Sequence, residues 1–315
     1  MMDPNLLFWK NQRQGFLSRV RIWLDILDPT FLLSSDAEIQ KAHASLASGE
    51  KLSEKDSHAL TLSLSSVHAD SGAVLPLAFR PPALVPITAP VVAATFLPHT
   101  RVKHALFWQF LLQSYNAGFS YANRNSSSEQ RKAMPSKQFL LMAGTVSCAT
   151  VAGALPQVLI NRLRIRSAGI QTFLRSFLPF PLSAALAFFN VLTVRSEELE
   201  TGIQVFDFNG NPVGLSKVAG QKAVGETALS RALLFGATAL VPDSLVFLLQ
   251  RLRVIQKTSR LVTPLRAVSV VAVWCFMVPV SFSRFPQLGK IKTEYIEEHL
   301  QAAAYGNLLY YHRGL

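Results

Sequence analysis

Cysteine is scarce in this chain, which narrows the kinds of site it can hold. Cys148 and Cys275 are the two cysteines among 315 residues, and each lies in a long apolar stretch. Two cysteines without C-x-x-C spacing cannot by themselves hold an iron–sulfur cluster or a structural zinc ion, and they allow one disulfide at most. The composition excludes a disulfide-stabilised secreted fold, and we expect no metal site and no cofactor.

Signatures of catalysis and of nucleic-acid binding are also missing. The chain has no Walker A loop, no G-x-G-x-x-G after a strand, no H-E-x-x-H and no G-x-S-x-G. We therefore expect that it is not an enzyme. A formal net charge of +12 suits a polyanionic partner, but no continuous basic patch with interleaved aromatic residues occurs. We expect no nucleic-acid partner.

Charge is nearly absent from five stretches of about the length that spans a bilayer. Roughly 17 to 25 apolar residues in a helix cross a hydrocarbon core about 30 Å thick. One formal charge, Asp243, lies inside the five stretches when His104 is neutral. The sequence predicts an all-α multi-pass membrane protein with about five transmembrane helices: His104–Asn123, Gln138–Ile160, Ser176–Val194, Ala232–Gln250 and Ala267–Ser283.

Positive charge gathers in the loops that flank these stretches. Two loops, 161–175 and 251–266, carry Arg and Lys but no acid. Cations at the ends of spans indicate snorkelling and contact with anionic lipid. With five spans, both loops fall on the same side as the N-terminus, and the positive-inside bias puts that side at the negative face, which is the matrix in a mitochondrial inner membrane.

Prolines complicate the count of spans. The uncharged segment 81–98 contains Pro81, Pro82, Pro86, Pro90 and Pro98, and interior prolines are costly in a helix. We predict a proline-broken or re-entrant membrane segment here. The alternative is a sixth span, which moves the N-terminus to the other side.

The remaining segments predict a simple domain organisation. Residues 1–80 form an N-terminal helical region, and residues 104–285 form the bundle. The stripe Trp9, Phe16, Val20, Trp23 and Leu27 predicts one helix face, either packed on the protein or lying in the membrane interface. Asn209-Gly210 between short apolar runs predicts a β-hairpin within the extramembrane loop 195–228. Residues 286–315 form a C-terminal tail.

Polar residues inside the spans are the candidate site. We predict a substrate pathway lined by Gln113, Asn116, Asn123, Asn190 and Asp243, because polar groups in lipid are costly unless they face a cavity or a partner. The functional interpretation of these polar groups is a substrate or proton site, and neutral amides suit the two charged ends of a zwitterion. The structural alternative is hydrogen bonding between helices, and for Asp243 an ion pair.

An ordered set of motifs along nearly the whole chain resembles the sideroflexins. The family loop His-Pro-Asp-Thr/Ser is present as His68-Ala69-Asp70-Ser71, without the proline. The other shared motifs are Phe8-Trp9, Arg13-Gln14-Gly15-Phe16, Leu27-Asp28-Pro29-Thr30, Phe79-Arg80-Pro81, Leu141-Met142-Ala143-Gly144, Asn209-Gly210-Asn211, Phe285-Pro286-Gln287 and Tyr311-His312-Arg313-Gly314. The chain is most similar to a divergent branch of that family.

The resemblance implies a mitochondrial inner-membrane protein with two alternative functions. The first is amino-acid transport, which in the first family members means carrying serine into mitochondria. For the divergent branch, the resemblance does not imply serine as the substrate. The second is a non-transporting scaffold, because that branch is associated with respiratory complex I assembly and with iron–sulfur and iron homeostasis. On this alternative the N-terminal region and the 195–228 hairpin dock complex I assembly factors.

Overall fold

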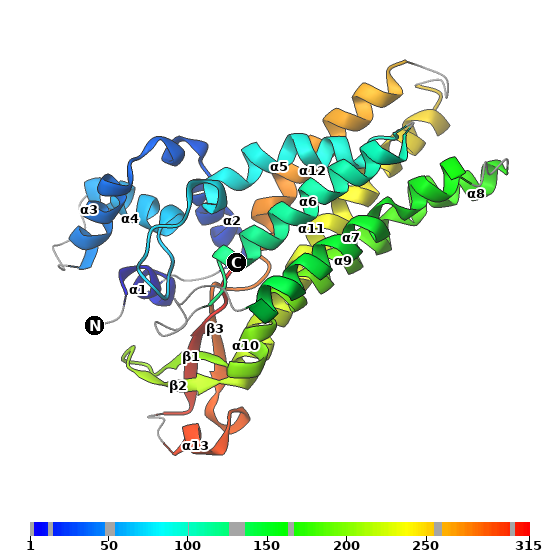
Figure 1. Cartoon of the computed structure of the whole chain (residues 1–315). Helices are drawn as coiled ribbons and strands as arrows, with labels where there is room; N and C mark the ends of the chain where they lie inside the picture. Colours follow the sequence, from blue (N-terminus) through cyan, green and yellow to red (C-terminus); the bar gives the residue numbers. More distant parts are fainter. Residues whose placement is uncertain are drawn as a thin grey trace.

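Six long helices form the body of the protein (Figure 1). The computed structural model describes residues 3–11, 15–47, 54–99, 101–125, 136–162, 167–254, 260–302 and 306–315. Arg13 and Gln14 of the family motifs lie outside the described residues, as do parts of the basic loops 161–175 and 251–266. The six helices are α5 Pro81–Phe96, α6 Val102–Ala122, α7 Ser136–Arg162, α9 Pro179–Val194, α11 Lys217–Arg251 and α12 Val262–Phe282.

The five predicted spans all fall on helices, but they are not equally suited to cross a membrane. Three stretches are long and apolar enough, namely Ser136–Ile160 in α7, α11 and α12, and α5 and α9 are shorter apolar helices. At 1.5 Å per residue, the 16 residues of α9 rise about 24 Å, less than the hydrocarbon core. The 21-residue α6 is long enough but carries the amide and hydroxyl side chains of the candidate site.

The proline-rich segment is one continuous helix, which corrects the prediction that its prolines break it. Pro81 and Pro82 occupy the first turn of α5, where backbone N–H groups have no helical acceptor in any case. Pro86 and Pro90 lie four residues apart on an exposed face, so the missing hydrogen bonds fall along one side of the helix. The opposite side of α5 packs on α6 and α12.

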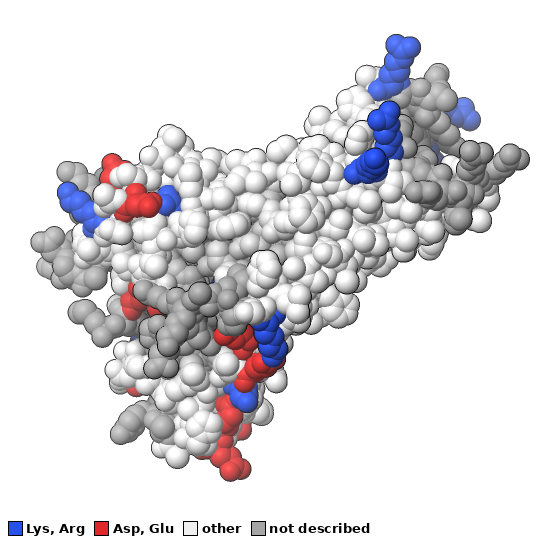
Figure 2. All heavy atoms as spheres, viewed as in Figure 1, with Lys and Arg blue, Asp and Glu red and all other residues white. Residues whose placement is uncertain are grey.

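This sixth helix changes the predicted arrangement of the loops. The N-terminal helices lie at one end of the bundle, and α8 (Ala168–Thr172) and the α11–α12 connection lie at the other (Figure 1). Figure 2 shows Lys and Arg side chains gathered at that second end. The expectation that the basic loops share a side with the N-terminus is therefore corrected, because α5 adds one more pass along the bundle.

The N-terminal region is helical, as predicted. Its helices are α1 Pro4–Asn11, α2 Phe16–Ile26, α3 Asp36–Ala47 and α4 Glu54–Ser66. The predicted stripe is divided between α1 and α2: Trp9 stacks on Trp23, and Trp23 meets Phe282 of α12 edge-on with ring centroids 4.9 Å apart. Both tryptophans are buried, which favours packing on the bundle.

The predicted hairpin is one half of a four-stranded antiparallel sheet. Strands β1 (Ile203–Phe206) and β2 (Pro212–Ser216) flank Asn209-Gly210, and Gly210 has a positive φ of 86°. The other two strands, β3 Leu288–Lys292 and β4 Leu308–His312, come from the C-terminal tail and give the order β2-β1-β4-β3. The short helices α10 Ser196–Thr201 and α13 Glu298–Gln301 lie beside this sheet. The tail is therefore part of a folded unit at the N-terminal end of the bundle.

Candidate functional site

A cavity of about 30 Å³ lies inside the bundle, between α5, α6, α9, α11 and α12. One water needs about 10–15 Å³ by this kind of measure, so the cavity holds about two waters. Three of the five predicted pathway residues line it: Gln113 and Asn116 from α6, and Asn190 from α9. The remaining wall is mainly apolar and includes Trp274 of α12.

The amides in this cavity have unused hydrogen-bonding capacity. Asn190 is 2% exposed, and neither its Oδ1 nor its Nδ2 has a hydrogen-bond partner among the described residues. Gln113 Oε1 is also unpartnered in the described part of the chain. Its Nε2 lies 3.5 Å from Gln109 Oε1, which is a long contact. Buried polar groups are nearly always paired, so these atoms indicate space for a polar ligand or water.

A buried arginine shares the cavity, and the sequence analysis missed it. Arg231 of α11 lines the cavity and is 7% exposed. Its guanidinium carbon lies 4.2 Å from the ring centroid of Phe282 and 5.4 Å from that of Phe119. The predicted span began at the next residue, so Arg231 counted as a flanking cation. The sequence signal that could have placed Arg231 inside the bundle was the Ser216 cap, because it begins one helix that continues without a break past residue 231.

The other two predicted residues lie elsewhere. Asn123 Nδ2 donates to the carbonyl oxygens of Phe79 at 2.9 Å and Phe119 at 3.0 Å, which ties the end of α6 to the start of α5. Asp243 forms an ion pair with Arg266 of α12, with Oδ1 2.8 Å from Nε. This pair lines a second cavity, of about 90 Å³, towards the basic end of the bundle. The structure therefore brings three of the five candidates together.

The two cavities adjoin. Phe96, Gln109 and Ser183 line both of them. The Gln109 amide lies against Gly153 of α7, where a β-carbon would come 2.6 Å from Oε1. A side chain that borders both spaces is placed to separate them, and its movement would join the Arg231 cavity to the Asp243–Arg266 end.

Comparison with known proteins identifies the family of this chain. The family model for sideroflexins matches residues 7–315. The chain belongs to the sideroflexin family. It is 51% identical to Sideroflexin-4 of Danio rerio and 36% identical to Sideroflexin-4 of Bos taurus, each over the full length of both chains. It is 30% identical to Sideroflexin-5 of Homo sapiens, over 96% of this chain and 91% of that one. No solved structure matches it.

The resemblance inferred from the motifs, including its divergent branch, is thus confirmed. This sideroflexin keeps the loop His68–Ser71, and the loop has a defined geometry without the family's proline. His68 Nε2 donates to the Arg124 carbonyl at 2.7 Å, while its Nδ1 accepts from the backbone N–H groups of Asp70 and Ser71, each at 3.3 Å. The imidazole of His68 thus joins the turn to the end of α6.

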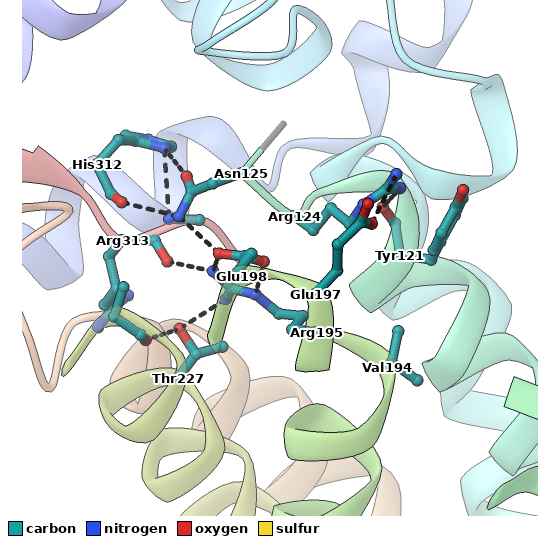
Figure 3. Close-up of polar contacts among 12 residues, drawn as sticks. Tyr121, Arg124, Asn125, Val194, Arg195, Glu197, Glu198, Thr227, His312 and Arg313 are labelled. Carbon is teal, nitrogen blue, oxygen red and sulfur yellow. Dashed lines mark hydrogen bonds and ion pairs between the residues drawn. The ribbon is translucent and has the colours of Figure 1, made fainter. Parts of the chain in front are cut away.

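A buried polar network joins this end of the bundle to the sheet (Figure 3). Asn125 Nδ2 donates to Glu198 Oε2 at 2.9 Å and to the His312 carbonyl at 3.0 Å. Burial, with the nearby His68, Arg195 and Arg313, lowers the pKa of His312 to about 3. The ring is therefore neutral at physiological pH, and its contact with Asp70 at 3.9 Å is not an ion pair. This network joins α6, α10 and the C-terminal strand, and His312 also lines a cavity of about 40 Å³ beside Asn123 and His68.

The described residues contain no group of three or more His, Cys, Asp or Glu side chains placed to hold a metal ion. Both cysteines are exposed on the bundle surface and are not joined to each other. Among the described residues, the two adjoining cavities inside the bundle hold three of the predicted amides and Asp243.

Proposed function

We propose that this protein is a mitochondrial inner-membrane carrier for a small amino acid. The observation that carries the proposal is the convergence of Gln113, Asn116 and Asn190, from two helices, on one enclosed cavity with unpartnered amide atoms. Amide oxygens and N–H groups complement the ammonium and carboxylate of a zwitterion. Membership of the sideroflexin family supports both the location and the transport class.

The small volume of the cavity fits a closed state of such a carrier. An amino acid is larger than two waters, so helices must move before a substrate enters. The second cavity and the Gln109 side chain between the two spaces supply a route towards the basic end. The positive-inside bias favours that end facing the matrix, with the N-terminal helices and the sheet on the opposite side.

Uptake of labelled amino acids into proteoliposomes that hold the purified protein tests the proposal. The panel covers neutral, acidic and basic amino acids and includes serine, with a serine-carrying family member as positive control. Saturable uptake of one amino acid is expected, and Asn190→Ala should reduce it at least tenfold while the protein stays folded. Absence of uptake from folded, inserted protein, beside an active control, would contradict the carrier function.

A scaffold function in complex I assembly is the second candidate. It is favoured by the extramembrane unit at the N-terminal end of the bundle, which exposes the apolar side chains Phe208 and Tyr295. In cells that lack the protein, a scaffold predicts that Phe208→Ser with Tyr295→Ser fails to restore complex I, whereas Asn190→Ala restores it. A carrier predicts the reverse pattern.

A further inference from the structure

Arg231 carries a charge that no described residue balances. It is buried at 7% exposure, and it makes no hydrogen bond and no ion pair with any residue that the structure describes. An arginine stays protonated in proteins, and an unpaired charge among apolar helices is costly. The other buried arginines near it are paired: Arg195 with Glu198, and Arg313 with backbone carbonyl groups.

The cavity offers Arg231 no acid. Of the residues that line it, Arg231 is the one with a formal charge, and the polar neighbours are amides and hydroxyls. The cavity is therefore positive overall. Such a space repels a cationic ligand and attracts an anionic group, and the planar guanidinium can meet a carboxylate with two parallel hydrogen bonds.

The rings beside Arg231 hold its guanidinium in place but accept no hydrogen bond from its N–H groups. The guanidinium carbon lies over the rings of Phe282 and Phe119, which gives cation–π stabilisation. Hydrogen bonds of a guanidinium leave along its edge, in its own plane. A cation positioned by ring contacts that use none of its in-plane donors is preorganised to bind an anion.

We propose that Arg231 binds the carboxylate of the cavity's ligand, a small carboxylate-bearing molecule of net charge zero or −1; this assignment rests on the proposed function. Gln113 Oε1 and Asn190 Oδ1 then accept from the ammonium group of an amino acid, since both oxygens lack partners in the described chain. A basic amino acid, with net charge +1, is excluded because the cavity wall has no acid to balance it.

A ligand pair that differs in the carboxylate alone tests the assignment. The probes are glycine, L-alanine and L-serine, each beside its carboxamide, with inorganic phosphate as a different anion. Binding is measured by titration calorimetry on the full-length protein in nanodiscs. The parent protein should bind at least one amino acid at least tenfold more tightly than its carboxamide, and phosphate should not compete.

Substitution of Arg231 completes a double-mutant cycle between residue and ligand. Arg231→Gln should reduce affinity for the amino acid to that of the carboxamide and leave carboxamide affinity unchanged. Arg231→Lys, which keeps the charge, should retain part of the preference for the amino acid over its carboxamide. This variant keeps the test valid if the glutamine variant misfolds. Arg284→Gln, an exposed arginine outside the cavity, is the matched control and should change neither affinity.

Several results overturn the assignment. They are equal binding of amino acid and carboxamide by the parent, equal loss of both ligands in Arg231→Gln, no binding of any carboxylate probe, and binding of phosphate alone. Uptake without dependence on Arg231 would remove the carboxylate assignment and leave the carrier standing. Arg231-dependent carboxylate binding without uptake would support the assignment and contradict the carrier.

Discussion

Arg195 and Glu198 form a buried ion pair, with Arg195 Nε and Nη2 donating to the two carboxylate oxygens at 2.5 and 2.7 Å. The side chain of Arg195 is fully buried, and that of Glu198 is 4% exposed. Arg195 Nη2 also donates to the Arg313 carbonyl at 2.8 Å, and Nη1 donates to Thr227 Oγ1 at 3.1 Å (Figure 3). One guanidinium thus joins the end of α9, the long helix α11 and the C-terminal tail.

Replacing Arg195 should therefore destabilise the fold strongly. Arg195→Gln leaves Glu198 buried without its cation, and removal of one partner of a buried pair costs about 3–5 kcal/mol. Lys137→Gln breaks an exposed pair with Glu200 and should change stability by less than about 1 kcal/mol. Thermal unfolding of both variants in detergent measures the difference. Equal melting temperatures would mean that the buried pair is not needed for stability.

Two glycines of α11 make a matched pair. A β-carbon at Gly220 would lie 2.4 Å from the backbone oxygen of Glu198, whereas at Gly225 it would meet nothing within 4 Å. Gly220→Ala should destabilise the protein by about 1–3 kcal/mol through overpacking. Gly225→Ala should stabilise it by about 0.5–1 kcal/mol, because alanine loses less conformational freedom in a helix. Parallel melting curves test this, and the same sign for both would contradict it.

Acid should weaken the junction between the sheet and the bundle. Burial lowers the pKa of His312 to about 3, below its value near 6.5 in an unfolded chain. The unfolded state therefore binds more protons between these values, and stability is lost as pH falls from about 6.5 towards 3. His312→Gln should flatten the fall in melting temperature between pH 7 and pH 5. His299→Gln, on the exposed face of α13, should leave that slope as in the parent.

The Asp243–Arg266 pair should behave as a structural link. Asp243→Ala leaves Arg266 unpaired beside the second cavity and should lower the melting temperature. The double variant Asp243→Leu with Arg266→Met should recover most of the loss, since neither charge then remains. A double variant less stable than both single variants would exclude this role and return Asp243 to the transport pathway.

Local features of the fold were predictable because each is determined by near neighbours. The apolar runs mark the bundle helices, and Asn209-Gly210 marks the hairpin. The cap of α3 is equally local: Ser35 Oγ accepts from the Glu38 backbone N–H, and Glu38 Oε2 accepts from the Ser35 backbone N–H.

Features that depend on distant partners were not predictable. Strand β4 pairs with β1 across about a hundred residues, and nothing local in the tail marks that partner. Similarly, three of the four predicted amides line the cavity. Arg231 was not predicted there, because a charge beside an apolar run normally points to solvent. Its inward position depends on packing against residues far away in the sequence, among them Phe282 and Phe119.

The strand order β2-β1-β4-β3 has a consequence for biogenesis. The hairpin can form once residues near 216 are available, but its inner edge stays unpaired until β4 arrives from the end of the chain. An unpaired strand edge is a template for association with other chains. A polypeptide that lacks its C-terminal end would therefore expose the unpaired edge of β1 beside the bundle. Such an edge would distinguish unfinished from finished molecules.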